Sequence, residues 1–254
     1  MIPKIIHQTY SHAPIPERFQ EAVEKLKSLN PDWEYRFYDN QDRENYIVSM
    51  FDEEMLKVYR SINPDYGASR ADFFRYLVLF KEGGAYLDIK STCIRPFSEV
   101  IHEEDEFIIS NWPAENDEFR DFGYHHELAH IEGGEFQQWC IFASPNSAFL
   151  KAVIDSMVKK IKNYSPWKNG VGRRGVLRTT GPIMYTQAIY PLLSSHKHRF
   201  EKSHLNLGLV YSIFEHPSQH RGYVSNHYTK NRNPIIMKEG FLARLSDGFY
   251  KIFH

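Results

Sequence analysis

Cysteine is scarce in this sequence, and its scarcity excludes one class of protein. The 254 residues include two cysteines, Cys93 and Cys140, and their separation matches no metal-binding or redox pair. Two such cysteines cannot form a disulfide scaffold, and they fit a reducing compartment. At this length the chain can instead bury a full apolar core. The sequence therefore predicts a cytoplasmic α/β protein stabilised by its core.

Long apolar runs and an excess of charge of one sign are also missing. No run approaches the roughly 20 apolar residues that span a bilayer, and the mean hydropathy is -0.53. The segment Pro3-Lys4-Ile5-Ile6 lacks the charged-then-apolar pattern of a signal peptide. The 31 basic and 32 acidic residues nearly cancel, which argues against a nucleic-acid partner. We therefore expect a soluble protein.

The most informative stretch runs from residue 63 to residue 92. Turn residues at Asn63-Pro64-Asp65 precede a mostly apolar segment that predicts a buried helix over 68–81. Gly83-Gly84 ends that helix, and 85–89 predicts a strand. Because side chains alternate along a strand, Tyr86, Asp88 and Lys90 should share the face opposite Ala85 and Leu87.

Charged residues in this stretch point to a ligand site. Asp72 and Arg75 share one face of the predicted helix, where buried charges need partners. Asp88 and Lys90 stand about 7 Å apart at the end of the strand, where open α/β sheets bind ligands. Taken singly, Asp72 could cap the helix in a Ser69-x-x-Asp72 capping box, and Asp88 and Lys90 could form an exposed ion pair. Taken together, the charges favour a ligand site.

These residues resemble a known family. The runs Ser69-Arg70-Ala71-Asp72-Phe73-Phe74-Arg75-Tyr76 and Gly83-Gly84-Ala85-Tyr86-Leu87-Asp88 are similar to the core of DXD-type glycosyltransferases. The similarity is to bacterial and fungal enzymes related to the yeast initiating α-1,6-mannosyltransferase, and more distantly to clostridial glucosylating toxins. It implies a GT-A-type fold, with a mostly parallel sheet flanked by helices. It also implies that Asp72 and Arg75 hold the donor sugar and ribose, and that Asp88 begins the DXD motif.

The second acid of that motif is replaced by a lysine, because the chain reads Asp88-Ile89-Lys90. Two carboxylates would hold a divalent cation, Mn²⁺ or Mg²⁺, that neutralises the donor diphosphate. Asp88 can retain the cation with help from elsewhere, or Lys90 can itself offset the diphosphate charge. The rest of the motif favours a retained cation. His227 and Lys230, in a segment that loosely resembles the family's C-terminal strand, are candidates for the missing metal or phosphate contact.

Other segments add donor-site candidates. Ile2 to Tyr10 resembles the start of the family, and a strand, helix 17–29 and strand 33–38 predict a parallel βαβ unit. Tyr10 occupies a position where relatives carry an aromatic near the nucleotide base. Thr179-Thr180-Gly181-Pro182 resembles a segment near the donor and predicts a helix to 189. The predicted donor-binding set is His7, Gln8, Thr9, Tyr10, Asp39, Arg70, Asp72, Arg75, Gly84, Tyr86, Asp88, Lys90, Thr180, Gly181, Pro182 and Lys230.

A rival motif follows in a polar region. His126-Glu127-Leu128-Ala129-His130 matches H-E-x-x-H, which on a helix binds zinc in metallopeptidases. The flanking glycines leave little room for a helix, and no third ligand is evident. A second interpretation assigns His125, His126, Glu127 and His130 to an acceptor-side loop, where imidazoles and carboxylates meet sugar hydroxyls.

Two further patterns carry less weight. Gly170-Val171-Gly172-Arg173-Arg174-Gly175 matches G-x-G-x-x-G, but no strand precedes it, so a solvated loop is predicted instead. Strands are also predicted over 107–110, 137–143 and 207–213, and an amphipathic helix over 148–162. A helix over 238–253 has an apolar stripe that would pack on the body or contact the inner face of a membrane as a peripheral anchor.

The sequence therefore predicts one domain over 1–254. The donor-binding core would comprise 1–110 and 175–232, and 111–175 would form an acceptor-side insert. The resemblance implies a retaining hexosyltransferase that moves a sugar from a nucleoside-diphosphate donor to a glycan or lipid-linked glycan. A bacterial surface polysaccharide, such as a capsule or lipopolysaccharide, is the expected product. A zinc peptidase and a non-catalytic sugar-nucleotide-binding relative remain the alternatives.

Overall fold

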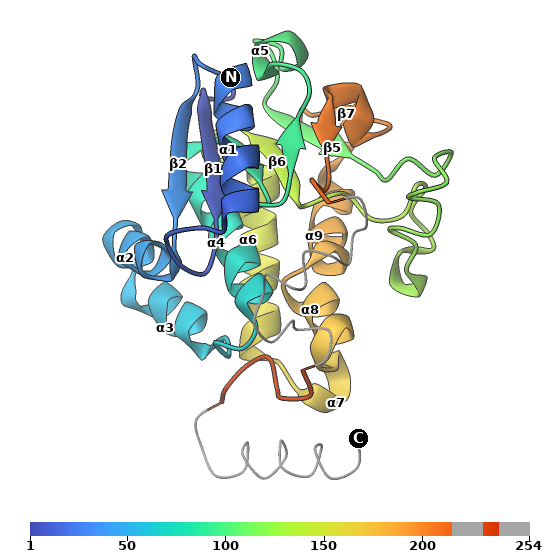
Figure 1. The fold of residues 1–254 in the computed structure, drawn as a ribbon. Helices are drawn as coiled ribbons and strands as arrows, with labels where there is room; N and C mark the ends of the chain where they lie inside the picture. The colour runs from blue at the N-terminus through green and yellow to red at the C-terminus, as the bar shows by residue number, and fades with distance from the viewer. Residues whose placement is uncertain (215–230, 239–254) are drawn as a thin grey trace.

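A six-stranded mixed sheet lies between two layers of helices in the computed structural model, which describes residues 1–214 and 231–238 (Figure 1). The strand order is β2-β1-β3-β6-β5-β7. β1 pairs in parallel with β2 and β3, and β5 pairs in parallel with β7, whereas β6 runs antiparallel to β3 and β5. The predicted parallel βαβ opening and the mostly parallel sheet are confirmed.

The elements of the first half are β1 (Ile5–Thr9), α1 (Glu17–Leu29), β2 (Glu34–Tyr38), α2 (Asn40–Met50), α3 (Glu53–Ser61), α4 (Gly67–Glu82), β3 (Gly84–Leu87), β4 (Thr92–Cys93), α5 (Phe97–Val100) and β5 (Phe107–Ser110). The second half contains η1 (His126–Leu128), β6 (Cys140–Ala143), α6 (Ala148–Lys162), α7 (Pro166–Asn169), α8 (Gly172–Thr179), α9 (Pro182–Ile189), η2 (Tyr190–Leu192), β7 (Arg199–Glu201), η3 (His204–Leu207) and β8 (Leu209–Val210). β4 and β8 form a separate two-stranded sheet.

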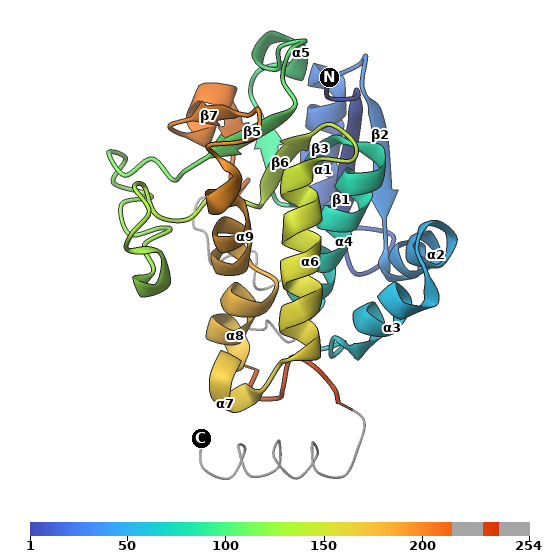
Figure 2. The same ribbon diagram turned by 180° about the vertical axis from the view of Figure 1, so that it is seen from behind.

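The helices divide between the two faces of the large sheet. α1 and α5 cover one face, and α4, α6 and α9 cover the other, as the view from behind makes plain (Figure 2). Ala85 and Leu87 of β3 pack towards α1, and Tyr86 packs towards α4, as the predicted alternation requires. Each fully buried large side chain contributes about 1.5–3 kcal/mol, so β3, buried on both faces, anchors the fold.

The Gly83-Gly84 turn sets the close approach of α4 to the sheet. Gly84 has φ of +98°, and a Cβ atom there would lie 2.4 Å from the carbonyl oxygen of Ile5. Only glycine tolerates both constraints. His7 then fixes the turn from β1, because its Nε2 lies 3.0 Å from the Gly83 carbonyl oxygen.

Several predicted elements need correction. The segment 169–175 is not a loop: α7 ends at Asn169, and α8 begins at Gly172. The strands predicted over 137–143 and 207–213 shorten to β6 and β8. β6 lies in the large sheet and α6 packs on α4, so much of the predicted insert 111–175 belongs to the core. The helix predicted over 238–253 and the segment 223–230 lie almost wholly outside the described residues.

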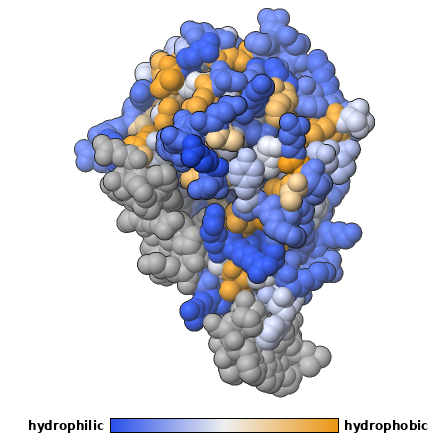
Figure 3. Space-filling view, turned by 90° about the vertical axis from the view of Figure 1, so that its right-hand side faces the viewer, coloured by the Kyte–Doolittle hydropathy of each residue, from blue (hydrophilic) through white to orange (hydrophobic). Residues whose placement is uncertain are grey.

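The hydrophilic character of the surface agrees with the low mean hydropathy of the sequence. On the face drawn in Figure 3, hydrophilic residues predominate and hydrophobic residues form scattered groups. Within residues 1–214 and 231–238, no helix has the length and apolar character needed to cross a membrane.

Candidate functional site

A cleft of about 920 Å³ opens between α4, the end of β3, and the segments 121–125 and 135–139. Of the predicted site residues, eleven line it: Thr9, Tyr10, Arg70, Asp72, Arg75, Tyr86, Asp88, Lys90, His125, Gly181 and Pro182. The end of a central strand is where an open α/β sheet presents its ligand site. The cleft is therefore the candidate site.

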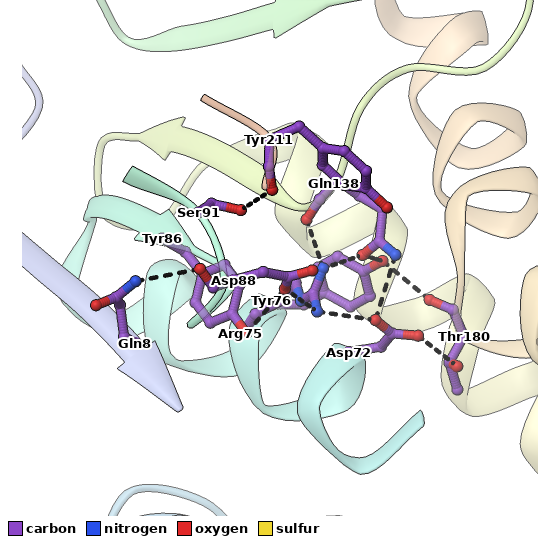
Figure 4. A network of polar contacts seen from close by, with 10 residues as sticks. All are labelled: Gln8, Asp72, Arg75, Tyr76, Tyr86, Asp88, Ser91, Gln138, Thr180 and Tyr211. Atoms are coloured by element: carbon purple, nitrogen blue, oxygen red, sulfur yellow. Dashed lines mark hydrogen bonds and ion pairs between the residues drawn. The ribbon is translucent and has the colours of Figure 1, made fainter. Parts of the chain in front are cut away.

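A buried charge cluster forms the floor of the cleft, with Arg75 at its centre (Figure 4). Nη2 of Arg75 lies 3.1 Å from Oδ1 of Asp72 and 2.9 Å from Oδ1 of Asp88. Its guanidinium also stacks over the ring of Tyr86, at 4.6 Å from the centroid. The predicted convergence of Asp72, Arg75 and Asp88 on one pocket is what the structure contains.

Gln138 completes this cluster and was not predicted. Its carbonyl and its side-chain oxygen each accept a hydrogen bond of 2.6 Å from Nη1 of Arg75. Its amide nitrogen donates to Asp72 over 3.2 Å, and the hydroxyl of Tyr76 donates to its Oε1 over 2.9 Å. Gln138 lies 63 residues from Arg75, just before β6, and no motif marks it. Sequence patterns alone offer no signal for such a contact.

The three charged residues differ in what they offer a ligand. Asp72 and Arg75 have side chains only 5% and 4% exposed, and both carboxylate oxygens of Asp72 are engaged, since Thr180 donates to Oδ2 over 2.9 Å. The side chain of Asp88 is 27% exposed. All three line the cleft and Asp88 is the most exposed of them, held by Arg75, which Asp72 binds in turn.

Burial and charge oppose each other at the cluster. Burial raises the pKa of Asp72 to about 6, although the nearby charge of Arg75 and the Thr180 hydrogen bond lower it. Burial lowers the pKa of Arg75, but Tyr86, Asp88 and Asp72 outweigh that effect and raise it above its ordinary value. Arg75 is therefore a permanent buried cation that needs its acidic partners.

Lys90 does not form the exposed ion pair that the sequence allowed. β3 ends at Leu87, and the amide of Ser91 turns back to the Asp88 carbonyl over 2.8 Å, which takes Lys90 off the strand. The Lys90 ammonium lies over the ring of Tyr211, 3.8 Å from its centroid. Lys90 thus stands on the cleft wall as a half-buried cation beside Asp88.

Several predicted donor residues support the cleft rather than line it. Gln8 donates to the Asp88 carbonyl over 3.1 Å, and Thr180 orients Asp72. Asp39 caps α2, with its Oδ1 accepting from the amides of Gln41 and Asp42. His7 and Gly84 shape the glycine turn. In this structure these five residues support the cleft and do not line it, and their predicted part in donor binding stays a prediction.

Two other predicted roles change at α4. Arg70 borders the cleft, but its Nε and Nη2 donate to the Ile62 carbonyl and its guanidinium covers the ring of Tyr59. Asp72 is not a capping residue, because α4 begins at Gly67 and no side chain caps it. Tyr10 borders the cleft and packs 5.4 Å from Phe19, and its place near the nucleotide base stays a prediction.

The H-E-x-x-H segment does not form a zinc-binding helix. Only His126–Leu128 is helical, as one 3₁₀ turn, and His126 and His130 are exposed. Glu127 pairs with Arg178 instead. Over the described ranges, no group of three His, Cys, Asp or Glu side chains is placed to hold a metal. The arrangement of these residues does not support the zinc peptidase alternative.

Residues 1–214 and 231–238 offer few ligands for the divalent cation that the family resemblance implies. Asp88 supplies one carboxylate, its Oδ1 is bound by Arg75, and Lys90 replaces the second acid. The described residues therefore do not fit a cation site by themselves. The predicted ligand His227 and the phosphate candidate Lys230 lie outside them.

The fold and the cleft define a GT-A-type α/β protein with a charged site at the end of a central strand. Residues 16–108 match the family model described as "Glycosyltransferase sugar-binding region containing DXD motif", which confirms the predicted resemblance over that region. The PaToxG glycosyltransferase shares the fold, with a TM-score of 0.54 and 19% identity over 76% of this chain and 70% of its own.

Curated relatives match mainly through the same region. Inositol phosphoceramide mannosyltransferase 3 of Schizosaccharomyces pombe is 37% identical over 101 residues, covering 40% of this chain and 28% of its own length. The initiation-specific alpha-1,6-mannosyltransferase of that yeast is 26% identical over 208 residues, covering 76% of this chain and 49% of its own. The chain spans about a quarter to a half of the length of these relatives.

Proposed function

We propose that this chain is a glycosyltransferase that moves a sugar from a nucleoside-diphosphate donor to a glycan acceptor. The observation that carries the proposal is the cleft floor, where Asp88 is the exposed edge of a buried Arg75–Asp72–Gln138 cluster. Most of that cluster falls within the region that matches the glycosyltransferase family. A preorganised carboxylate beside a cation suits a polar, doubly charged donor.

The donor would lie along the cleft from Tyr10 to Asp88. Asp88 offers a carboxylate to the sugar hydroxyls, and Tyr10 borders the other end of this path, with its ring packed on Phe19 and His12. Lys90 offers an ammonium to the diphosphate. As the sugar leaves, negative charge grows on the diphosphate, and a fixed cation at that position lowers the barrier. Arg75 acts by holding Asp88, and Asp72 by holding Arg75.

The charge of Lys90 bears on the cation. When a divalent cation is bound in such enzymes, it neutralises the leaving diphosphate. Here the half-buried ammonium of Lys90 would take part of that task, and the described residues give the cation one carboxylate. We therefore propose donor binding that depends less on Mn²⁺ or Mg²⁺ than a full DXD motif would require.

The names of the relatives suggest the donor sugar. Two of them are mannosyltransferases, so mannose is the first sugar to test. Retention of anomeric configuration and a lipid-linked or polysaccharide acceptor remain part of the proposal. Because these relatives are fungal, they lend no support to a bacterial capsule or lipopolysaccharide as the product.

Replacement of Asp88 tests the proposal. A panel of UDP- and GDP-sugars, with Mn²⁺ or with EDTA, identifies the donor that raises the melting temperature of the wild type. Asp88→Asn should then lower transfer at least 100-fold while the free protein stays folded, because Asp72 and Gln138 still bind Arg75. Asp39→Asn is the control, because asparagine also caps helices, and it should keep wild-type transfer.

The other outcomes are equally informative. Near-wild-type transfer by Asp88→Asn would refute the assignment. Donor binding with neither transfer nor donor hydrolysis would identify a binding-only relative. Wild-type transfer that survives EDTA supports the role given to Lys90, and its complete loss contradicts it.

A further inference from the structure

A second group of polar and aromatic side chains also lines the cleft. Nε2 of His125 lies 2.6 Å from Oε2 of Glu135, and Nε1 of Trp112 donates to Oε1 of Glu135 over 2.6 Å. All three line the cleft, and so does Tyr124. We name Trp112, Tyr124, His125 and Glu135 the acceptor wall.

The acceptor wall is held rigidly by backbone constraints. Gly123 and Gly134 have φ of +79° and +73°, and a Cβ on Gly134 would lie 2.5 Å from the Gly123 carbonyl oxygen. A Cβ on Gly123 would lie 2.6 Å from the ring of Trp112. The side-chain amide of Asn111 donates through Nδ2 to the carbonyls of Gly133 and Glu135 over 3.0 Å each. This much constraint fixes the side chains before a ligand arrives.

The hydrogen bonds determine which nitrogen of His125 faces a ligand. The Glu135 side chain is 9% exposed, and a buried carboxylate needs donors on both oxygens. Trp112 supplies one donor, and His125 supplies the other through Nε2–H. Nδ1 of His125 then makes no hydrogen bond to any residue in 1–214 or 231–238, and the side chain remains 16% exposed on the cleft. In the neutral imidazole, Nδ1 is then an oriented acceptor atom.

The residue before His125 carries an exposed aromatic ring that also lines the cleft. Tyr124 is 61% exposed although it lines the cleft. Aromatic rings cover the apolar face of flat polar ligands, and a neighbouring acceptor atom then fixes their orientation. A sugar ring, with C–H groups on one face and hydroxyls at its edge, matches both features.

Resting on the proposed function, we propose that the acceptor wall binds the acceptor sugar. A hydroxyl of that sugar donates to Nδ1 of His125, and the sugar ring stacks on Tyr124. Glu135 is a positioning residue that sets the tautomer and orientation of His125. Glu135 of the acceptor wall and Gln138 of the Arg75 cluster both lie in segment 135–139. The acceptor sugar and the donor would therefore meet across this one short stretch of chain.

Acceptor binding can be measured without turnover. Saturation-transfer NMR with methyl α-mannoside and methyl α-glucoside as probes should detect binding to the wild type. His125→Ala and Tyr124→Ala should each weaken binding at least five-fold, while the melting-temperature response to the donor stays unchanged. The matched control is His126→Ala, because that neighbouring imidazole is exposed and outside the cleft.

A second variant separates positioning from folding. Glu135→Gln keeps an oxygen for Trp112 but weakens the bond to His125, so the acceptor KM should rise several-fold with the donor KM unchanged. Glycoside binding that survives both His125→Ala and Glu135→Gln overturns the proposal, and so does an equal loss in His126→Ala. Absence of donor binding in the wild type would instead overturn the proposed function, because the glycoside measurement does not require a donor.

Discussion

At the scale of single residues, the site depends on partners that are distant in sequence. Asp72, Arg75 and Asp88 lie within 17 positions of one another, and a buried helix with charges followed by a strand predicts that they converge. Gln138 and Thr180 bind the same charges from other parts of the chain. No local pattern encodes those contacts, because a glutamine or threonine in an irregular segment is compatible with many environments. The sequence therefore predicted the charges, and the family resemblance placed Thr180 near the donor, but neither predicted the contacts that orient those charges.

Gln138→Ala should separate orientation from stability. Every partner of its side chain keeps another bond: Tyr76 keeps the Thr180 carbonyl, and Arg75 keeps the Gln138 backbone carbonyl. The fold should survive, but Asp72 and Arg75 gain freedom. A misplacement of about 1 Å costs on the order of 100-fold in rate. We expect kcat to fall by roughly 10- to 100-fold, with a small change in melting temperature.

The adjacent glutamine provides the matched control. Gln137 is also buried, but its side chain binds Ser110 and His204, on the other side of the segment. Gln137→Ala should lower the melting temperature and leave kcat nearly unchanged. The same kinetic loss in both variants would show that Gln138 matters only for stability.

At the scale of elements, apolar periodicity predicted well wherever packing dominates. α1, α4, α6 and β5 begin and end within one residue of their predicted bounds, because each has an apolar face or surface that must be buried. α7 and α8 were missed because Gly170, Gly172 and Gly175 weaken any helical signal. In the structure Gly175 is required by contact, since a Cβ there would lie 2.5 Å from the Gly170 carbonyl oxygen.

The Gly83-Gly84 turn gives a test at this scale. Gly84→Ala places a Cβ 2.4 Å from the Ile5 carbonyl oxygen and forces a positive φ on alanine. Positive φ alone costs about 1–2 kcal/mol, and the contact with the neighbouring strand adds to it. We expect a loss of at least about 3 kcal/mol in the free energy of unfolding, measured by urea denaturation.

Gly67→Ala is the control for that variant. Gly67 begins α4, and nothing lies within 4 Å of an added Cβ. Alanine there should leave the free energy of unfolding within about 1 kcal/mol of the wild type, and it should raise this free energy rather than lower it. If both variants were equally stable, the turn could not be what holds α4 against β1.

At the scale of the whole molecule, segments from distant regions of the chain line the cleft. α4 and β3 form its floor, residues 112–139 form one wall, and α8 and α9 form another. Residues 231–238 join two of these regions. The backbone amide of Asn63 donates to the Ile235 carbonyl over 2.8 Å. The Tyr66 hydroxyl accepts from the Gly172 amide over 3.0 Å and donates to the Asn233 carbonyl over 2.5 Å. Contacts beside the cleft therefore also stabilise the fold, so the free energy of unfolding should respond to changes in the buried groups near the cleft.

Acid sensitivity of the whole fold follows from its buried titratable groups. Burial lowers the pKa of His7 and of His204 from 6.5 to about 4. The unfolded chain therefore binds more protons at these positions, and stability is lost as pH falls from about 6.5 to about 4. Asp72 acts in the opposite sense, because its folded pKa of about 6 exceeds 3.8, and its protonation stabilises the fold over part of that range.

The net effect and its origin can be measured by urea denaturation between pH 4 and pH 7. For His7 the difference of 6.5 − 4 = 2.5 pKa units corresponds to about 3 kcal/mol at most. His7→Gln removes this titration and should flatten the pH dependence of the unfolding free energy, whatever its effect on stability at pH 7. Asp72→Asn removes the opposing contribution and should steepen it. A wild-type slope in His7→Gln would mean that His7 is not held neutral between Gly83 and Tyr38, and that another group controls the acid limit of this fold.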